Sequence, residues 1–347
     1  MGRDDRGPDA EDRPSAPALC RSGAARLRAS RRARLSRVIE PEATPGAAQG
    51  PPHFFSPPGS AVTLRLPCPP PYDWASIRAF LAKRAILGVE SAEADAQSYA
   101  RTVCVGGRPG IVAVAFGDDA LHATLRGLDV SSGPEIAARL RRLFDCDADP
   151  VAIAACLSRD PALAGLVAAR PGLRLPGAWD PFETGCRAIL GQQVSVQAAI
   201  RLAGKLVAAF GTPLAEPAGS LTHVFPTPPQ LAEADVALAL NMPRARGAAI
   251  RALAAAALAD SDLFDPAGTL EEAVLRFTAI RGIGPWTAQY IAMRALKLPD
   301  ALPVGDVGLL RALETATGRP SAAALLARAE AWRPFKGLRG PAPMGRR

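Results

Sequence analysis

The alternation of apolar and polar residues predicts a small sheet early in the chain. Residues 62–66 alternate as the residues of a half-buried strand do. The pattern continues in three more strand-like stretches, at 98–105, 110–116 and 121–128. Asp73 caps a helical stretch whose apolar residues share one face, and Pro134 opens a second helix. We therefore expect an α+β domain over residues 57–145, in which two helices cover an antiparallel sheet.

Beyond residue 145 the apolar residues recur at helical spacing, and no stretch convincingly predicts a strand. Capping residues and prolines, which favour the first turn of a helix, indicate where the helices of this part of the chain begin. They stand at Asp180-Pro181, Ser195, Thr227-Pro228, Pro243 and Thr269. We therefore expect an all-helical domain over residues 146–335.

One turn within the helical part carries a chemical signal. A helix ends at Ile280, Arg281-Gly282-Ile283-Gly284 follows, and Pro285 opens the next helix. Two glycines let the chain reverse tightly and approach a flat surface. The amides that follow a proline at a helix N-terminus suit a phosphate oxygen, through hydrogen bonds and the helix dipole. These residues alone predict either an ordinary tight turn or a phosphate clamp that ignores base sequence.

The residues after the hairpin favour the clamp. The stretch FTAIRGIGPWTAQYIAMRALKLPDALPVGD (277–306) leads from the hairpin through a loop to Asp306, which precedes another apolar helix. In this spacing it resembles the signature of the helix-hairpin-helix DNA glycosylase superfamily. Within that superfamily the chain is similar to the DNA-3-methyladenine glycosylase II family over about residues 63–335. The shared segments are PPYDW (70–74), FETGCRAILGQQVSVQAA (182–199), FPTP (225–228), MPRARGAAI (242–250) and the hairpin through Asp306.

The resemblance implies a hydrolase of base excision repair. Such an enzyme flips an alkylated base of the 3-methyladenine type out of duplex DNA, cleaves its N-glycosidic bond and leaves an abasic site. Asp306 would be the catalytic carboxylate that stabilises the positively charged sugar. The residues next to Asp306, taken alone, favour a role as the N-cap of the following helix, and one carboxylate can serve as both cap and catalytic group. Relatives that also cut the strand carry a lysine where this chain has Trp286, so the resemblance implies a monofunctional enzyme.

The resemblance also assigns a pocket and a set of DNA contacts. Trp286 and Tyr290 share one helix face, either as core residues or as pocket walls that stack on an electron-poor base. Gln193 would fill the gap left by the flipped base, or would be an exposed loop amide. On the helix after Pro243, Arg244, Arg246 and Arg251 are phosphate contacts or part of a solvated face. The expected DNA contacts are Gln193, Arg281, Gly282, Ile283, Gly284, Thr287, Arg244 and Arg246.

Composition narrows the expected partners and cofactors. The net charge of +8 suits a polyanion such as double-stranded DNA. The six cysteines lack CxxC spacing and none follows Cys186, so we expect no iron–sulfur cluster and no other cofactor, although the hairpin could hold a monovalent cation. No apolar run reaches the length of about 20 residues that a membrane span needs, and the N-terminus lacks a secretory signal. We expect a cytoplasmic, nucleoid-associated monomer.

Two segments fall outside the resemblance. Residues 1–56 carry seven arginines between Arg21 and Arg37 without an acidic residue, and we expect a disordered basic extension or an arm that holds phosphates. Residues 336–347 form an irregular basic tail where the family has an apolar helix that adds an aromatic residue to the pocket. An alternative function is therefore a non-catalytic helix-hairpin-helix DNA-binding protein. A glycosylase for oxidised or mismatched bases is disfavoured by Trp286 and by the missing cysteine cluster.

Overall fold

The computed structural model describes residues 62–92, 97–266, 268–314 and 318–337. They all belong to one structural unit, which starts at Pro41. The basic extension expected over residues 1–56 lies outside the described residues, as does most of the tail expected over 336–347.

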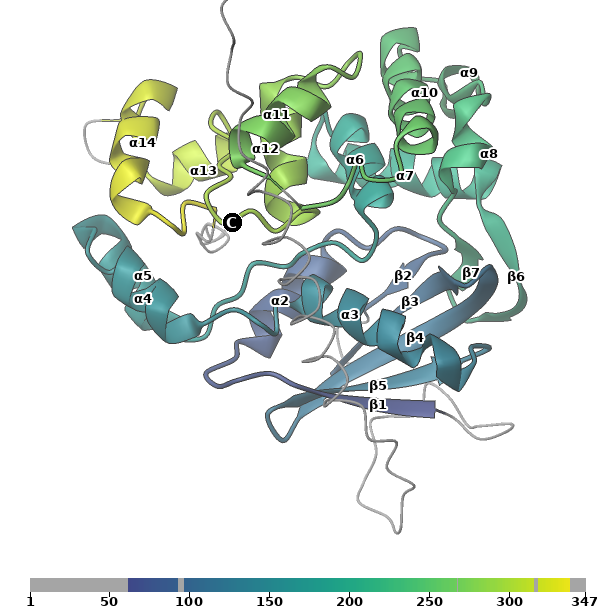
Figure 1. Ribbon diagram of the computed structural model, residues 1–347, viewed down its shortest axis with the longest axis horizontal. Helices are drawn as coiled ribbons and strands as arrows, with labels where there is room; N and C mark the ends of the chain where they lie inside the picture. The colour runs from purple at the N-terminus through teal and green to yellow at the C-terminus, as the bar shows by residue number, and fades with distance from the viewer. Residues whose placement is uncertain (1–61, 93–96, 267, 315–317, 338–347) are drawn as a thin grey trace, which may run out of the picture. The chain divides into compact units, whose positions relative to one another are not determined.

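The first part of the chain forms an antiparallel sheet with strand order β1-β5-β4-β3-β2 (Figure 1). The strands are β1 (Val62–Pro67), β2 (Glu90–Ser91), β3 (Ser98–Val105), β4 (Arg108–Gly117) and β5 (Ala120–Arg126). The first strand pairs with the last, so that Val62 lies opposite Leu125 and Pro67 opposite Ala120. The four longer strands confirm the expectation. The sequence did not predict β2, because two residues are too short to show an alternation.

Two helices, α2 (Trp74–Ala82) and α3 (Gly133–Phe144), pack their apolar side chains with those of this sheet. The carboxylate of Asp73 caps α2, accepting a hydrogen bond from the Ser76 amide at 3.0 Å. The shared core includes Trp74, Ile77, Tyr99, Ile136 and Leu140. The expected α+β arrangement of a sheet with two helices is confirmed.

The rest of the described chain is mostly helical. Its helices are α4 (Pro150–Leu157), α5 (Pro161–Ala169), α6 (Pro181–Leu190), α7 (Val196–Phe210), α8 (Pro228–Ala232), α9 (Val236–Leu240), α10 (Arg244–Ala259), α11 (Leu270–Thr278), α12 (Pro285–Arg294), α13 (Val307–Ala312) and α14 (Ala322–Ala329). The caps expected at 180, 195, 227, 243 and 269 begin α6, α7, α8, α10 and α11. The Asp180 carboxylate accepts from the Glu183 amide at 2.9 Å, and the Ser195 hydroxyl from the Ala198 amide at 3.2 Å. No helix among the described residues is both long and apolar enough to span a bilayer.

One element was wrong in the sequence interpretation, which found no strand beyond residue 145. β6 (Thr212–Ala218) and β7 (Leu221–Val224) form a two-stranded hairpin between α7 and α8. Prolines at 213 and 217 hide the strand pattern of β6. The hairpin is held by packing against the large sheet, in a buried cluster that includes Leu214, Leu221, Val224, Ala100 and Ile111. Tertiary contact rather than local alternation therefore fixes these strands.

The helices α6, α10 and α12 pack closely around one glycine. A Cβ atom added at Gly185 of α6 would lie 2.6 Å from the Leu253 side chain of α10 and 3.8 Å from that of Ile291 of α12. Such spacing leaves no room for a side chain, so glycine lets the three helices approach. This packing places the start of α12, and with it the hairpin, beside α10 and the end of α6.

Candidate active site

The hairpin before α12 is built on a glycine that cannot be replaced without strain. Gly282 has a φ of 88°, and a Cβ atom there would lie only 2.5 Å from the Cβ of Ala249 on α10. Ile283 is 3% exposed and anchors the turn in the core. Gly284 is the N-cap of α12, and no side chain caps that helix. The start of α12 is therefore exposed and free of a side-chain cap, and its binding of a phosphate oxygen stays a prediction.

The turn after α6 is tied to this hairpin by Gln192. Its amide nitrogen Nε2 donates to the Gly282 carbonyl at 3.0 Å and to the Thr287 hydroxyl at 3.1 Å. Arg246 donates to the Gln192 carbonyl at 2.7 Å. The sequence assigned Thr287 and Arg246 to DNA, but Thr287 is 3% exposed and the Arg246 side chain supports the turn. A DNA contact at Thr287 would therefore use its backbone amide.

Three further DNA candidates, Gln193, Arg281 and Arg244, are exposed, whereas the side chain of Ile283 is buried and could not contact DNA. Gln193 stands at the tip of the turn with a φ of 56°, directly after the anchored Gln192. Arg281 in the hairpin and Arg244 at the start of α10 are also exposed. Within the described residues neither arginine has a carboxylate partner. Their charge is therefore available to a phosphate.

The aromatic pair on α12 is stacked. The ring centroids of Trp286 and Tyr290 are 5.4 Å apart, and the planes are inclined by 15°. Both residues are only half-buried. The interpretation of both as core residues is therefore weaker than the interpretation as a stacking surface for a base.

Asp306 fills one of the two roles that the sequence left open, that of an N-cap, and its catalytic role stays a prediction. Its oxygen Oδ1 accepts a hydrogen bond from the Leu309 amide at 2.9 Å and so caps α13. The described residues give the second oxygen, Oδ2, no hydrogen-bond partner. The side chain is half-buried, and the preceding Gly305 has a φ of 95°. One oxygen thus fixes the carboxylate while the other is available to a reacting sugar.

The sequence interpretation missed a cationic neighbour of this site. Arg84, just after α2, lies with its Cζ atom 3.8 Å from the ring centroid of Phe80. Burial lowers the pKa of Arg84, whereas the nearby Tyr290 and Asp306 act in the opposite direction. Arg294 of α12 is centred 4.3 Å from the same Phe80 ring and 5.8 Å from that of Tyr290.

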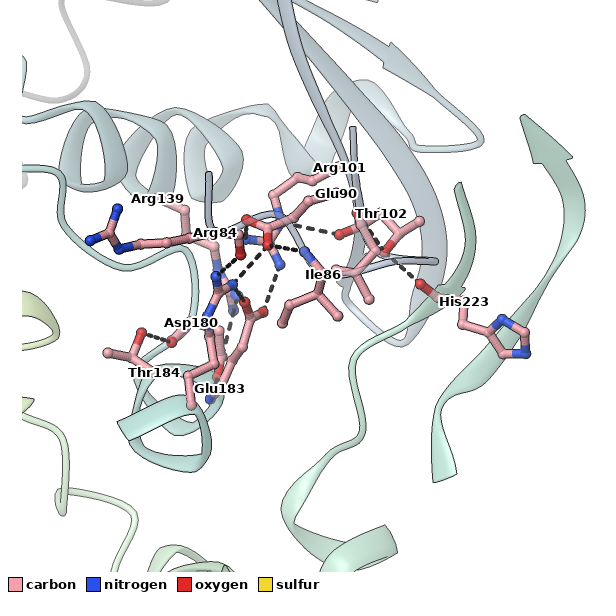
Figure 2. A network of polar contacts seen from close by, with 12 residues as sticks. Arg84, Ile86, Glu90, Arg101, Thr102, Arg139, Asp180, Glu183, Thr184 and His223 are labelled. Carbon is pink, nitrogen blue, oxygen red and sulfur yellow. Dashed lines mark hydrogen bonds and ion pairs between the residues drawn. The ribbon is translucent and has the colours of Figure 1, made fainter. Parts of the chain in front are cut away.

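A buried ionic network joins the sheet to α6 (Figure 2). Arg101 of β3 pairs with Glu183 of α6 at 2.6 Å, and Arg187 pairs with Glu90 at 2.8 Å and with Glu183 at 3.0 Å. Burial alone would raise the pKa of Glu90, but Arg187 and Arg101 outweigh it and hold that pKa below its usual value. The Glu183 side chain, in the first turn of α6, therefore links this helix to the sheet.

The described residues contain no group of three or more histidine, cysteine, aspartate or glutamate side chains that could hold a metal ion. The hairpin carbonyls remain the expected place for a monovalent cation. No described contact tests that expectation.

Comparisons with known proteins cover most of the chain. The profile of the AlkA N-terminal domain matches residues 63–180, and that of the HhH-GPD superfamily base excision DNA repair proteins matches residues 186–336. DNA-3-methyladenine glycosylase 2 of Escherichia coli (strain K12) is 38% identical over 272 residues, which cover 77% of this chain and 91% of that protein.

A longer relative matches at similar identity. The probable bifunctional transcriptional activator/DNA repair enzyme AlkA of Mycobacterium tuberculosis (strain CDC 1551 / Oshkosh) is 41% identical over 276 residues, or 79% of this chain and 55% of the relative. The chain therefore spans about half the length of this relative. Among solved structures, the 3-methyladenine DNA-glycosylase from Archaeoglobus fulgidus shares the fold, with a TM-score of 0.67 and 21% identity over 79% of this chain and 94% of that one.

Proposed function

The chain belongs to the DNA-3-methyladenine glycosylase family of the HhH-GPD superfamily, and from this we propose that it is a monofunctional glycosylase that removes alkylated bases from duplex DNA. The observation that carries the proposal is the Asp306 carboxylate, which is fixed by one oxygen and open at the other. It stands in the same structural unit as a stacked aromatic pair and a hairpin suited to phosphate.

The chemistry follows from this arrangement. The bond between the sugar C1′ and the base nitrogen breaks, and its electron pair leaves with the base. The sugar becomes positively charged, and the open oxygen of Asp306 stabilises that charge. Water then adds at C1′ and loses a proton, which leaves an abasic site. An alkylated base is often cationic and already leaves readily, so one carboxylate suffices.

Two side chains decide what else the enzyme does. Trp286 occupies the position where an amine would form a covalent bond with the sugar, so we propose that the strand is left uncut. Gln193 at the exposed turn would enter the space vacated by the flipped base. The same proposal includes four further points: the partner is an alkylated duplex, the protein is a monomer, it is located in the cytoplasm, and it acts without an iron–sulfur cluster.

Asp306→Asn tests the proposal because it separates charge from capping. Asparagine at an N-cap still accepts a hydrogen bond from the helix, whereas it cannot neutralise a positive sugar. We expect release of methylated purines from alkylated duplex DNA to fall by roughly a hundredfold or more. Asp235→Asn is the matched control, because Asp235 caps α9 in the same way, with the Leu238 amide at 3.1 Å.

Binding to a duplex with an abasic-site analogue completes the test. Release by the original chain that is lost only in Asp306→Asn, with binding retained in both, would support the enzyme and its carboxylate. Binding without release in either protein would refute catalysis and favour the non-catalytic DNA-binding alternative.

A further inference from the structure

Arg84 is a cation without an acidic partner among the described residues. Its guanidinium stacks on Phe80, with the Cζ atom 3.8 Å from the ring centroid, and Nη1 donates to the Phe80 carbonyl at 3.4 Å. The backbone carbonyl of Arg84 accepts from Arg187 at 2.5 Å, so the chain is held in place at this point. The side chain is half-buried. A partly desolvated guanidinium is thus fixed in position with donor groups left over.

Its nearest charged neighbour across the Phe80 ring is a second cation, Arg294. Arg294 is 7% exposed, and its Cζ atom lies 4.3 Å from the centroid of the same Phe80 ring and 5.8 Å from that of Tyr290. Arg294 and Arg187 both disfavour the charge on Arg84, and Asp306 is the one carboxylate among the principal influences on it. The Arg294 guanidinium therefore lies beside Tyr290 of the aromatic pair that is expected to hold the flipped base, and Arg84 shares the Phe80 ring with it.

This charge distribution matters for the leaving group. Stacked aromatic rings attract a cationic base, which becomes neutral when its glycosidic bond breaks. A neutral damaged base instead leaves with the electron pair as an anion, and takes up a proton only afterwards. A fixed guanidinium repels the first kind of base and stabilises the departure of the second through a charge-assisted hydrogen bond.

We propose that Arg84 is a specificity-determining residue that supports the excision of neutral damaged bases relative to cationic ones. The inference rests on the proposed glycosylase function. The reaction remains a hydrolysis: the C1′–N bond breaks, water supplies the new C1′–O bond, and the departing anion ends protonated. Arg84 only stabilises negative charge and is neither consumed nor deprotonated.

Two competing roles for Arg84 make different predictions. If Arg84 only held Phe80 in place, or only contacted a DNA phosphate, its loss would slow excision of every lesion by a similar factor. If it stabilises the leaving base, its loss changes the ratio of rates for neutral and cationic lesions. The ratio therefore separates specificity from stability and from affinity.

The experiment measures single-turnover excision by the full chain on two duplexes, one with a single hypoxanthine, which is neutral, and one with a single 7-methylguanine, which is cationic. We expect Arg84→Met, which keeps an apolar stem against Phe80, to lower the hypoxanthine to 7-methylguanine rate ratio at least about tenfold. Arg84→Lys retains the charge and should keep the ratio within about threefold. Arg65→Met, an exposed arginine on the edge strand β1, removes the same charge elsewhere and should not change the ratio.

The outcomes are distinguishable. An unchanged ratio in Arg84→Met, or an equal fall for both lesions, overturns the role of Arg84 and leaves the glycosylase intact. Excision of 7-methylguanine alone by the original chain overturns it as well. Excision of neither lesion refutes the proposed function itself. Should Arg84→Met unfold, as judged by circular dichroism, Arg84→Gln provides the same comparison with a polar stem.

Discussion

Replacing Gly282 by alanine should damage the hairpin more than any other single methyl group added there. The φ of 88° places residue 282 in a backbone region that costs a residue with a Cβ about 1–3 kcal/mol. The new Cβ would also lie 2.5 Å from the Cβ of Ala249, an overlap that typically costs about 1–3 kcal/mol. The two costs add to roughly 2–6 kcal/mol, which is a large fraction of the stability of a typical domain.

The same hairpin provides a matched control for this prediction. Gly284 has a φ of −87°, and a Cβ atom there would meet nothing within 4 Å. Alanine is a slightly poorer N-cap than glycine, so Gly284→Ala should lower the free energy of unfolding by less than about 1 kcal/mol. Both variants add one methyl group two positions apart, and only their surroundings differ.

Urea denaturation gives the free energy of unfolding of each variant, and fluorescence anisotropy gives its affinity for a duplex with an abasic-site analogue. We expect Gly282→Ala to lose both stability and affinity, because the hairpin can relieve the overlap only by moving away from α10. Equal losses in the two variants, or a loss below about 1 kcal/mol in Gly282→Ala, would refute the argument from backbone geometry and packing.

Two further predictions follow from side-chain contacts. Gln192→Ala removes both hydrogen bonds to the hairpin and should lower the free energy of unfolding by about 1–3 kcal/mol. Gln193→Ala, at the exposed tip of the turn, should leave the free energy of unfolding unchanged and reduce the rate of excision. Urea denaturation measures the first quantity and single-turnover assays the second. A hydrogen bond from Arg328 holds the pKa of Asp160 to about 2, below its unfolded value, so its stabilising effect is present above about pH 4 and is lost as the pH falls toward 2. Asp160→Asn should therefore lose less stability than the original chain between pH 5 and pH 3, and parallel losses in denaturation at the two pH values would contradict this.

The local features of the fold were predictable because neighbouring residues fix them. The caps at Asp73 and Ser195 begin their helices as their sequences indicate, and the alternation at 62–66 becomes β1. The strands β6 and β7 were not predictable, because their conformation depends on packing against a sheet about a hundred residues earlier in the chain. Sequence patterns of period two or 3.6 contain no information about such contacts.

The candidate site divides in the same way. The hairpin and Asp306 stand within one continuous motif, so the order of these residues along the chain was enough to identify them as candidate site residues. Thr287 belongs to the same motif, yet its side chain turns inward to Gln192, a contact that spacing alone does not reveal. Arg84 was missed for a different reason: it comes from the sheet part of the chain, and only the fold brings it to Tyr290 and Asp306.

The contrast between two groups of arginines supports a role for Arg84 beyond folding. Arg101 is buried and Arg187 is half-buried, and each is neutralised by Glu90 or Glu183. Burying a charge costs free energy that a carboxylate partner offsets, and Glu90 and Glu183 provide that offset for these two arginines. Beside Phe80, among the described residues, Arg84 has no such partner. A cation that folding leaves unneutralised at the edge of a base-stacking surface retains its electrostatic potential for a ligand, and the anion formed by a departing neutral base is the ligand that this position in the fold would meet.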